Sequence, residues 1–137
     1  MNKTARTITE LTLTALSGFA AFISPILLNP PNTLPKAPLF PIVRESVEHL
    51  RPASFIALAI VGLLAGAVGQ THWALLGLAS IAAFPICMIA ELAADPTSHN
   101  LFPFELVMYD AFSIPAILAA GLGRIPRVLI LSRHKSA

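Results

Sequence analysis

The polar side chains of this chain that could do chemistry gather between residues 91 and 110. The segment holds four of the seven acidic residues of the chain and one of its four histidines. Its polar candidates are Glu91, Asp95, His99, Asn100, Glu105 and Asp110. Histidine titrates near neutral pH, so it can exchange protons with a nearby carboxylate. The same side chains can also bind a ligand or a partner.

Asp110 is the hardest of these residues to explain by structure alone, because it lies inside an apolar stretch. A carboxylate at the centre of a membrane-spanning helix costs about 2.5–3.5 kcal/mol. We therefore expect Asp110 to face the interior of the protein and to have a polar partner there. Asp110, His99 and Glu105 are the candidate catalytic residues for proton transfer. Glu105 and Asp110 lie about 140° apart around a helix, so they do not form a pair on one face.

The other polar residues of the segment have structural explanations beside functional ones. Asp95 begins a sequence typical of a turn, and Glu105 follows a proline that suits the first turn of a helix. As binding residues we predict Glu91, Asp95 and Asn100, together with His49 from an earlier loop. If the two loops meet, they would form a composite cluster of two histidines and four carboxylates that would suit a divalent metal. Its members would be Glu45, His49, Glu91, Asp95, His99 and Glu105. The spacing matches no metal-ligand motif, so we assign neither a metal nor another cofactor.

Four apolar runs, each about as long as a bilayer is thick, must position these residues. They cover about residues 10–28, 53–69, 73–91 and 105–123. Charged residues make up only 12% of the chain, whereas soluble domains carry about 25%. The mean hydropathy is +0.75. The sequence therefore predicts an all-α integral membrane protein, with residues 1–137 forming a single domain of four transmembrane helices in a bundle.

The connections differ in composition and charge. Residues 29–52 form a proline-rich loop, and apolar residues at helical spacing within it predict a short amphipathic surface helix over 42–50. The two tails, including the basic tail 124–137, carry six Lys and Arg against three in the loops 29–52 and 91–104. The positive-inside rule then predicts cytoplasmic termini and two outward-facing loops. We expect a location in the cytoplasmic (inner) membrane of a bacterium.

The sequence also predicts which partners the protein has, and nucleic acid is not among them. The lipid bilayer surrounds the apolar runs. Gly62 and Gly66 form a GxxxG pattern, which lets two helices approach closely. The pattern fits packing against Gly77 and Ser80 of the third run, or a homodimer or contact with another membrane subunit. Nucleic acid is not predicted, because the tail has only four Lys and Arg and no Phe, Tyr or Trp among them.

Two classes of function fit these observations. The first is an accessory subunit, or a ligand- or partner-binding protein, that acts through the outer polar segment 91–110. The second is a membrane-embedded enzyme or carrier that uses Asp110, His99 and Glu105 for proton transfer on a lipid-soluble substrate. The sequence has no Gly-rich phosphate loop and no Gly-x-Ser-x-Gly motif. We favour the first class, because the chain is small and its carboxylates do not share a helix face.

Overall fold

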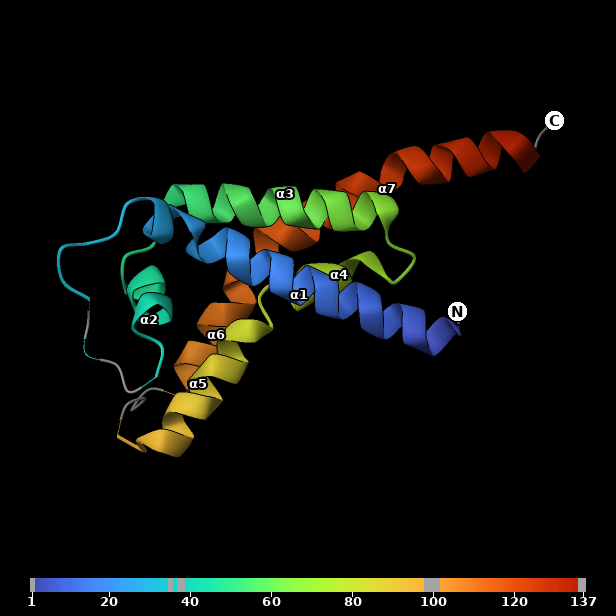
Figure 1. Cartoon of the computed structure of the whole chain (residues 1–137). Helices are drawn as coiled ribbons and strands as arrows, with labels where there is room; N and C mark the ends of the chain where they lie inside the picture. Colours follow the sequence, from blue (N-terminus) through green and yellow to red (C-terminus); the bar gives the residue numbers. More distant parts are fainter. Residues whose placement is uncertain (1, 35, 37–38, 98–101, 136–137) are drawn as a thin grey trace.

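The computed structural model describes residues 2–34, 36, 39–97 and 102–135, the last nine and residue 102 by their backbone alone. In this part of the chain all regular structure is helical. The helices are α1 (Lys3–Leu28), α2 (Pro41–Glu48), α3 (Pro52–Val68), α4 (Trp73–Ala79), α5 (Ala83–Ala94), α6 (Phe102–Phe112) and α7 (Ile114–Lys135). Figure 1 shows their arrangement.

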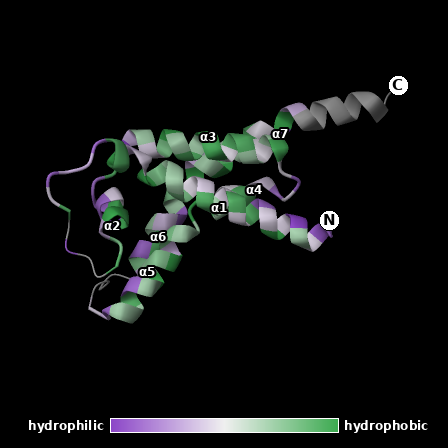
Figure 2. Cartoon of the chain, in the orientation of Figure 1, coloured by the Kyte–Doolittle hydropathy of each residue, from purple (hydrophilic) through white to green (hydrophobic). Residues whose placement is uncertain are grey.

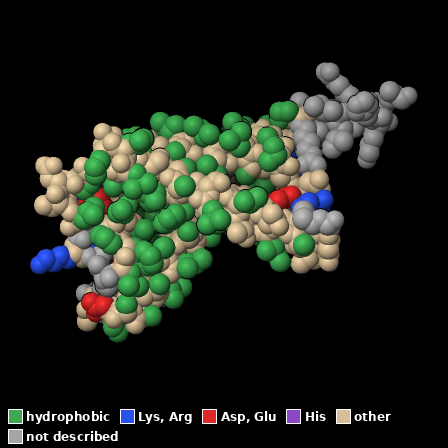
Figure 3. Space-filling model, in the orientation of Figure 1, with side chains coloured by type: hydrophobic (Ala, Val, Ile, Leu, Met, Phe, Trp, Pro, Cys, Tyr) green, Lys and Arg blue, Asp and Glu red, His purple; other side chains and the backbone are tan. Residues whose placement is uncertain are grey.

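Three helical segments are long and apolar enough to cross a membrane: Lys3–Leu28, Trp73–Ala94 and Pro103–Pro126. The helices α2 and α3 pass the same test only when they are taken together, although the chain bends by 104° between them, so the structure has three to four candidate spans. Many large apolar side chains on these helices are exposed. Figure 2 shows how hydrophobic residues are distributed along the helices, and Figure 3 shows hydrophobic side chains over much of one face of the molecule. An apolar surface of this extent is typical of a protein that contacts lipid.

The helices differ from the predicted runs mainly at their ends. The first helix begins at Lys3 rather than near residue 10, and α3 matches its predicted run within one residue. The third run forms two helices, α4 and α5, which are separated by a break that begins at Ser80. The fourth run forms α6 and α7, which are separated at Ser113. The residues predicted as a basic tail continue α7 to Lys135. The predicted short helix over 42–50 is confirmed as α2, which begins one residue earlier and ends at Glu48.

Four of the helices pack side by side. The third helix, α3, lies against α1 and α7, and α4 lies against the same two helices. In Figure 1 the start of α1 and the end of α7 lie at one end of this packing, and α2 lies at the other. At the first end the Glu10 carboxylate accepts hydrogen bonds from the backbone N–H groups of Gln70 (3.0 Å) and Thr71 (2.8 Å). The Arg124 guanidinium donates to the Thr71 carbonyl (2.8 Å), so the link between α3 and α4 is tied to α1 and α7.

The glycines of the GxxxG pattern bring the backbone of α3 directly against α7. A Cβ atom on Gly62 would overlap the carbonyl oxygen of Ala116, and one on Gly66 would overlap that of Ala120. The predicted packing of this pair against Gly77 and Ser80 is therefore wrong, since α7 occupies the position. A homodimer through the pair would have to displace α7.

The residues predicted as the partners of that pair make other close contacts. Gly77 lies against Ile117 of α7, and the backbone of Ser80 lies against Gly18 of α1. Both are contacts between small residues and a neighbouring backbone, the arrangement that allows helices to approach closely in lipid. The small residues of α4 therefore join it to α1 and α7 rather than to the glycine pair of α3.

Proline accounts for both breaks between helices. Pro85 and Pro115 lie in the first turns of α5 and α7, where a missing N–H costs no hydrogen bond. Pro25 is instead inside α1, which continues past it. The Ser24 hydroxyl donates to the Ala21 carbonyl (2.8 Å), which Pro25 leaves without its usual N–H donor.

We predict that Gly66→Ala destabilises the protein, because the added methyl group collides with backbone rather than with a movable side chain. Overpacking of this kind costs about 1–3 kcal/mol. Thermal unfolding in a mild detergent measures the effect. Gly121→Ala is the matched control: its Cβ would meet the Trp73 ring at 3.5 Å, an ordinary contact, so the variant unfolds at the wild-type temperature or above. Equal losses in the two variants would contradict the assigned contact.

Candidate ligand-binding site

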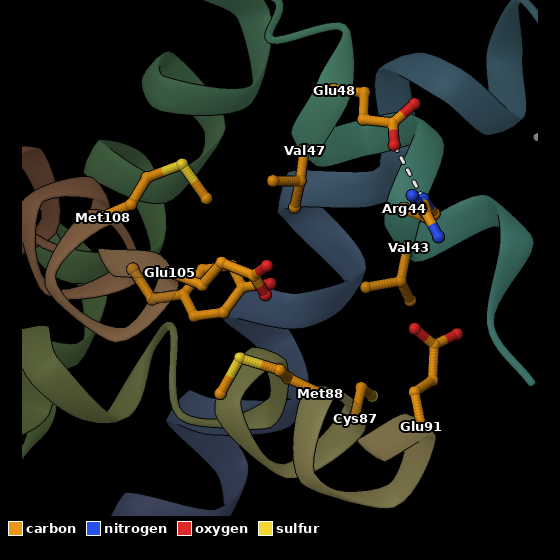
Figure 4. Close-up of a pocket in the computed structure, with 10 residues that line it drawn as sticks. Val43, Arg44, Val47, Glu48, Cys87, Met88, Glu91, Glu105 and Met108 are labelled. Carbon is orange, nitrogen blue, oxygen red and sulfur yellow. Dashed lines mark hydrogen bonds and ion pairs between the residues drawn. The ribbon is translucent and has the colours of Figure 1, made fainter. Parts of the chain in front are cut away.

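A cavity of about 280 Å³ opens between α2, α5 and α6 (Figure 4). It is lined by Val43, Arg44, Val47 and Glu48 of α2, by Cys87, Met88 and Glu91 of α5, and by Glu105, Met108 and Tyr109 of α6. The cavity thus combines apolar walls with a few charged groups, which is the usual composition of a small-molecule site.

The helix α2 is held against α5 by one buried carboxylate. Glu91 is only 4% exposed, and it accepts a hydrogen bond from the backbone N–H of Phe40 (2.8 Å), the residue just before α2. Pro41 provides a good first helical residue, and Val43 packs into the apolar core with Phe84. The short helix therefore forms one wall of the cavity, at the end of the molecule opposite the start of α1 (Figure 1).

The charged groups of the cavity come from all three helices. Arg44 and Glu48 form an ion pair along α2, with 2.7 Å between Nε and Oε1. This hydrogen bond is the main reason why the pKa of the Arg44 guanidinium lies above its usual value, and the negative charges of Glu91 and Glu105 raise that pKa further. In Figure 4 the carboxylates of Glu91 and Glu105 point into the space beside α2. Three carboxylates and one guanidinium thus line the cavity.

The structure brings two of the predicted polar residues, Glu91 and Glu105, to this cavity. Asp95 instead closes its own turn, as Oδ1 accepts hydrogen bonds from the N–H (2.9 Å) and the hydroxyl (2.7 Å) of Thr97. These bonds lower the pKa of the Asp95 carboxyl. His99 and Asn100 lie outside the described residues.

The predicted binding residue His49 does not line the cavity. Its Nδ1 lies 3.3 Å from the Glu45 carboxylate, and its side chain is 67% exposed. Among the described residues no three His, Cys, Asp or Glu side chains are grouped so that they could hold a metal ion. The composite metal cluster is therefore not assembled from this part of the chain, because Glu45 faces His49 and Asp95 binds within its own turn.

The expectation that Asp110 faces the interior is wrong, since its side chain is exposed. The interior face of this segment is taken by Tyr109, Phe112 and Ser113, which are all buried. The ring of Phe112 packs on Phe22, with 5.9 Å between ring centroids, so large aromatic side chains fill the space that a carboxylate would need. Asp110 points to a different side of α6, about 100° from Tyr109.

Its surroundings on that outer face are apolar. Val107, three residues earlier, is 67% exposed, and Ile114, four residues later, is 53% exposed. Residues three and four apart are neighbours on a helix surface. Asp110 is therefore a charged residue in the middle of an exposed apolar strip.

Several lining residues were missed by the sequence analysis, and a helical spacing could have indicated them. Cys87, Met88 and Glu91 share one side of α5, and Glu105, Met108 and Tyr109 share one side of α6. Only the fold shows that these two sides face each other and α2.

Comparisons with known protein families, with curated proteins and with solved structures found no match to this chain.

We predict that Asp110→Leu stabilises the isolated protein in a lipid bilayer, because it removes a charge from an apolar exposed strip. The expected gain is up to about 3 kcal/mol, and less if the residue lies near the bilayer edge. Thermal unfolding in lipid nanodiscs measures it, with Asp110→Asn as the variant that removes the charge but keeps a polar group. A loss of stability in Asp110→Leu would instead indicate a polar contact that the native carboxylate makes.

Proposed function

We propose that this is a small integral membrane protein of four spanning helices that binds a small ligand through the cavity between α2, α5 and α6. The observation that carries the proposal is the cavity itself, with its apolar walls and its inward-pointing carboxylates. The four spans would be α1, α3, α4 with α5, and α6 with α7. The 17 residues of α3 measure about 26 Å along a helix, against about 30 Å of hydrocarbon.

The proposed orientation has cytoplasmic termini in an inner membrane. It is supported by the excess of Lys and Arg in the two tails. The arrangement in Figure 1 fits it, since the start of α1, the link between α3 and α4 and the end of α7 lie at one end. The cavity would then open on the outer side of the membrane, beside the surface helix α2.

The orientation predicts which introduced cysteines an impermeant thiol reagent reaches on intact cells. Both Thr97 and Asn2 are exposed. In a Cys87→Ala background, which removes the single native thiol, Thr97→Cys should be labelled from outside. Asn2→Cys should be labelled only after the cells are permeabilised. The reverse pattern would place the cavity on the cytoplasmic side.

The walls of the cavity suit a compact ligand with an apolar part. Its volume of about 280 Å³ lies just below the range of about 300–1,000 Å³ that is usual for ligand sites. Met88 of α5 and Met108 of α6 both line it, and methionine side chains adapt their shape to different apolar groups.

Cys87 makes this proposal testable, because it lines the cavity and is the only cysteine in the chain. We expect N-phenylmaleimide, a small apolar reagent, to modify Cys87 in the purified protein. Val47→Trp should slow the reaction at least about tenfold, since an indole in place of an isopropyl group fills much of a site of this size. Mass spectrometry of the intact protein follows the reaction.

The matched control is Val68→Trp, which makes the same substitution at an exposed position near the end of α3, away from the cavity. It should leave the labelling rate unchanged. Both variants should unfold at similar temperatures. If Val47→Trp reacts as fast as Val68→Trp, the reagent does not reach Cys87 through the cavity, and the proposed binding function fails.

A second candidate function, that of an accessory subunit, is favoured by Asp110. A carboxylate in an exposed apolar strip is costly in lipid, and a basic residue on a helix of another membrane protein would remove that cost. The remaining alternative is an enzyme or carrier that transfers protons through Asp110, His99 and Glu105. It has less support, because Asp110 is exposed and does not line the cavity that contains Glu105.

A further inference from the structure

We infer that the exposed side of the segment Pro103–Pro126 is a docking surface for a membrane-spanning helix of a different protein, and that this helix carries an Arg or Lys opposite Asp110. The inference rests on the proposed membrane location and on the second candidate function, that of an accessory subunit, and it specifies the partner. It does not depend on what the cavity binds. The surface consists of Val107, Asp110, Ile114 and Leu118, and we call it the Asp110 strip.

The Asp110 strip is a continuous side of the segment that the rest of the protein leaves uncovered. Its four residues follow one another at intervals of three or four, so they are neighbours on a helix surface. All four are exposed. The opposite side of the segment is occupied, because Phe112 packs in the core and Ala116 meets Gly62 of α3. No helix in the described part of the chain therefore takes the place of a partner on the strip.

The depth of Asp110 makes it the residue that determines the partner. Pro103 and Asp110 are seven residues apart, which is about 11 Å along a helix. In a span of this length Asp110 lies about a third of the way through some 30 Å of hydrocarbon. The Asp110 carboxylate has no hydrogen bond or ion pair with any residue that the structure describes. A carboxylate at such a depth is costly unless a cation or a polar group pairs with it.

This chain cannot supply that cation, either from its own helices or from a second copy. No Lys or Arg occurs between residues 7 and 35 or between residues 52 and 123. The first basic residue after Asp110 is Arg124, at the far end of the segment, where it binds the Thr71 carbonyl. At the end near α2, Arg44 is paired with Glu48. The complementary charge therefore comes from a different protein.

The neighbours of Asp110 favour a helix as the partner. Val107, Ile114 and Leu118 are large apolar side chains that can pack against those of a second helix in lipid. Such packing excludes water from the charge pair, and the attraction between the two charges is stronger there than in water. A single polar pair in an apolar interface also fixes the register of two helices. The partner is thus held at one depth and with one side toward the strip.

The test measures association with synthetic membrane-spanning peptides by energy transfer between dyes. A donor dye is attached to Asn2→Cys in the Cys87→Ala background. The protein is inserted into phosphatidylcholine vesicles, whose surface has no net charge to attract a basic peptide. Each peptide has about 20 leucine and alanine residues and an acceptor dye. Three peptides differ at one position, a third of the way along, which is arginine, glutamine or glutamate.

The measured quantity is the peptide-to-lipid ratio that gives half of the maximal transfer. We expect it to be about tenfold lower for the arginine peptide than for the other two, the factor that a polar contact between membrane helices provides. Asp110→Asn should raise it about tenfold for the arginine peptide and change it little for the glutamine peptide. Asp110→Lys should reverse the order of the arginine and glutamate peptides, and it keeps the inference testable if Asp110→Asn does not fold.

A pair of tryptophan variants tests whether the strip is the contact surface. Ile114→Trp should weaken association with the arginine peptide severalfold, because an indole beside Asp110 holds the partner helix away. Ile60→Trp is the matched control, since it makes the same substitution on α3 and both isoleucines are 53% exposed. It should leave the association unchanged.

Each other outcome overturns the inference in a recognisable way. Equal association of the three peptides, or arginine-peptide association that survives Asp110→Asn, would remove the role of the charge. Equal effects of the two tryptophan variants would remove the assigned surface. Transfer between donor- and acceptor-labelled copies of the protein that Asp110→Asn abolishes would identify a second copy as the occupant.

The proposed function fails separately. If the protein does not float with the vesicles in a density gradient, the membrane location and this inference both fail. If it floats and the peptides do not differ, only this inference fails. The ligand-binding cavity is tested by the labelling of Cys87, which does not involve Asp110.

Discussion

The close contact between the backbones of α3 and α7 is the constraint on which the rest of the structure depends. In lipid, apolar side chains gain little by leaving the solvent, so helices associate through close packing of small residues. Gly62 and Gly66 meet Ala116 and Ala120 in this way, and Gly123 approaches the Leu63 carbonyl from the α7 side. Because only Ser113 separates α6 from α7, the position of α7 also determines where α6 ends and which way its buried side faces.

Two buried serines lie at the points where the third and fourth apolar segments break, and these breaks make room for the cavity. Ser80 and Ser113 are fully buried, and each hydroxyl donates to the carbonyl three residues earlier, that of Gly77 and that of Asp110, at 2.6 Å. The serines satisfy carbonyls at the points where the helices break. Figure 1 shows α5 and α6 leaving the side-by-side helices at these junctions. The helix α2 lies beside α5 and α6, and the cavity is the space that these three helices leave unfilled.

Much of the fold could be predicted from the sequence, because hydropathy and proline report directly on spans and their connections. The amphipathic spacing after Pro41 also predicted α2. The partner of the glycine pair could not be predicted, since small residues occur in several spans and the pattern does not say which helix it meets. The predicted orientation of Asp110 was wrong because it rested only on the free-energy cost of placing a carboxylate in lipid. The volume of the neighbouring rings of Tyr109 and Phe112 decides which side of α6 faces inward. Glu91 and Glu105 were found by their residue type, whereas Arg44 and the methionines became part of the site only through the fold.

The cavity wall formed by α2 is anchored at both of its ends, although the loop before it is rich in proline. Before the helix, the Phe40 N–H binds Glu91 of α5. After it, the Arg51 guanidinium donates to the Pro25 carbonyl (2.7 Å) and the Asn29 carbonyl (3.3 Å), at the C-terminal end of α1, where a positive charge is favoured. Glu91 therefore has two roles, since it holds the wall and also lines the site. A ligand that binds near this carboxylate meets a wall already in position, so less of its binding energy is lost in ordering the protein. By the same coupling, the ligand and the position of α2 must influence each other equally.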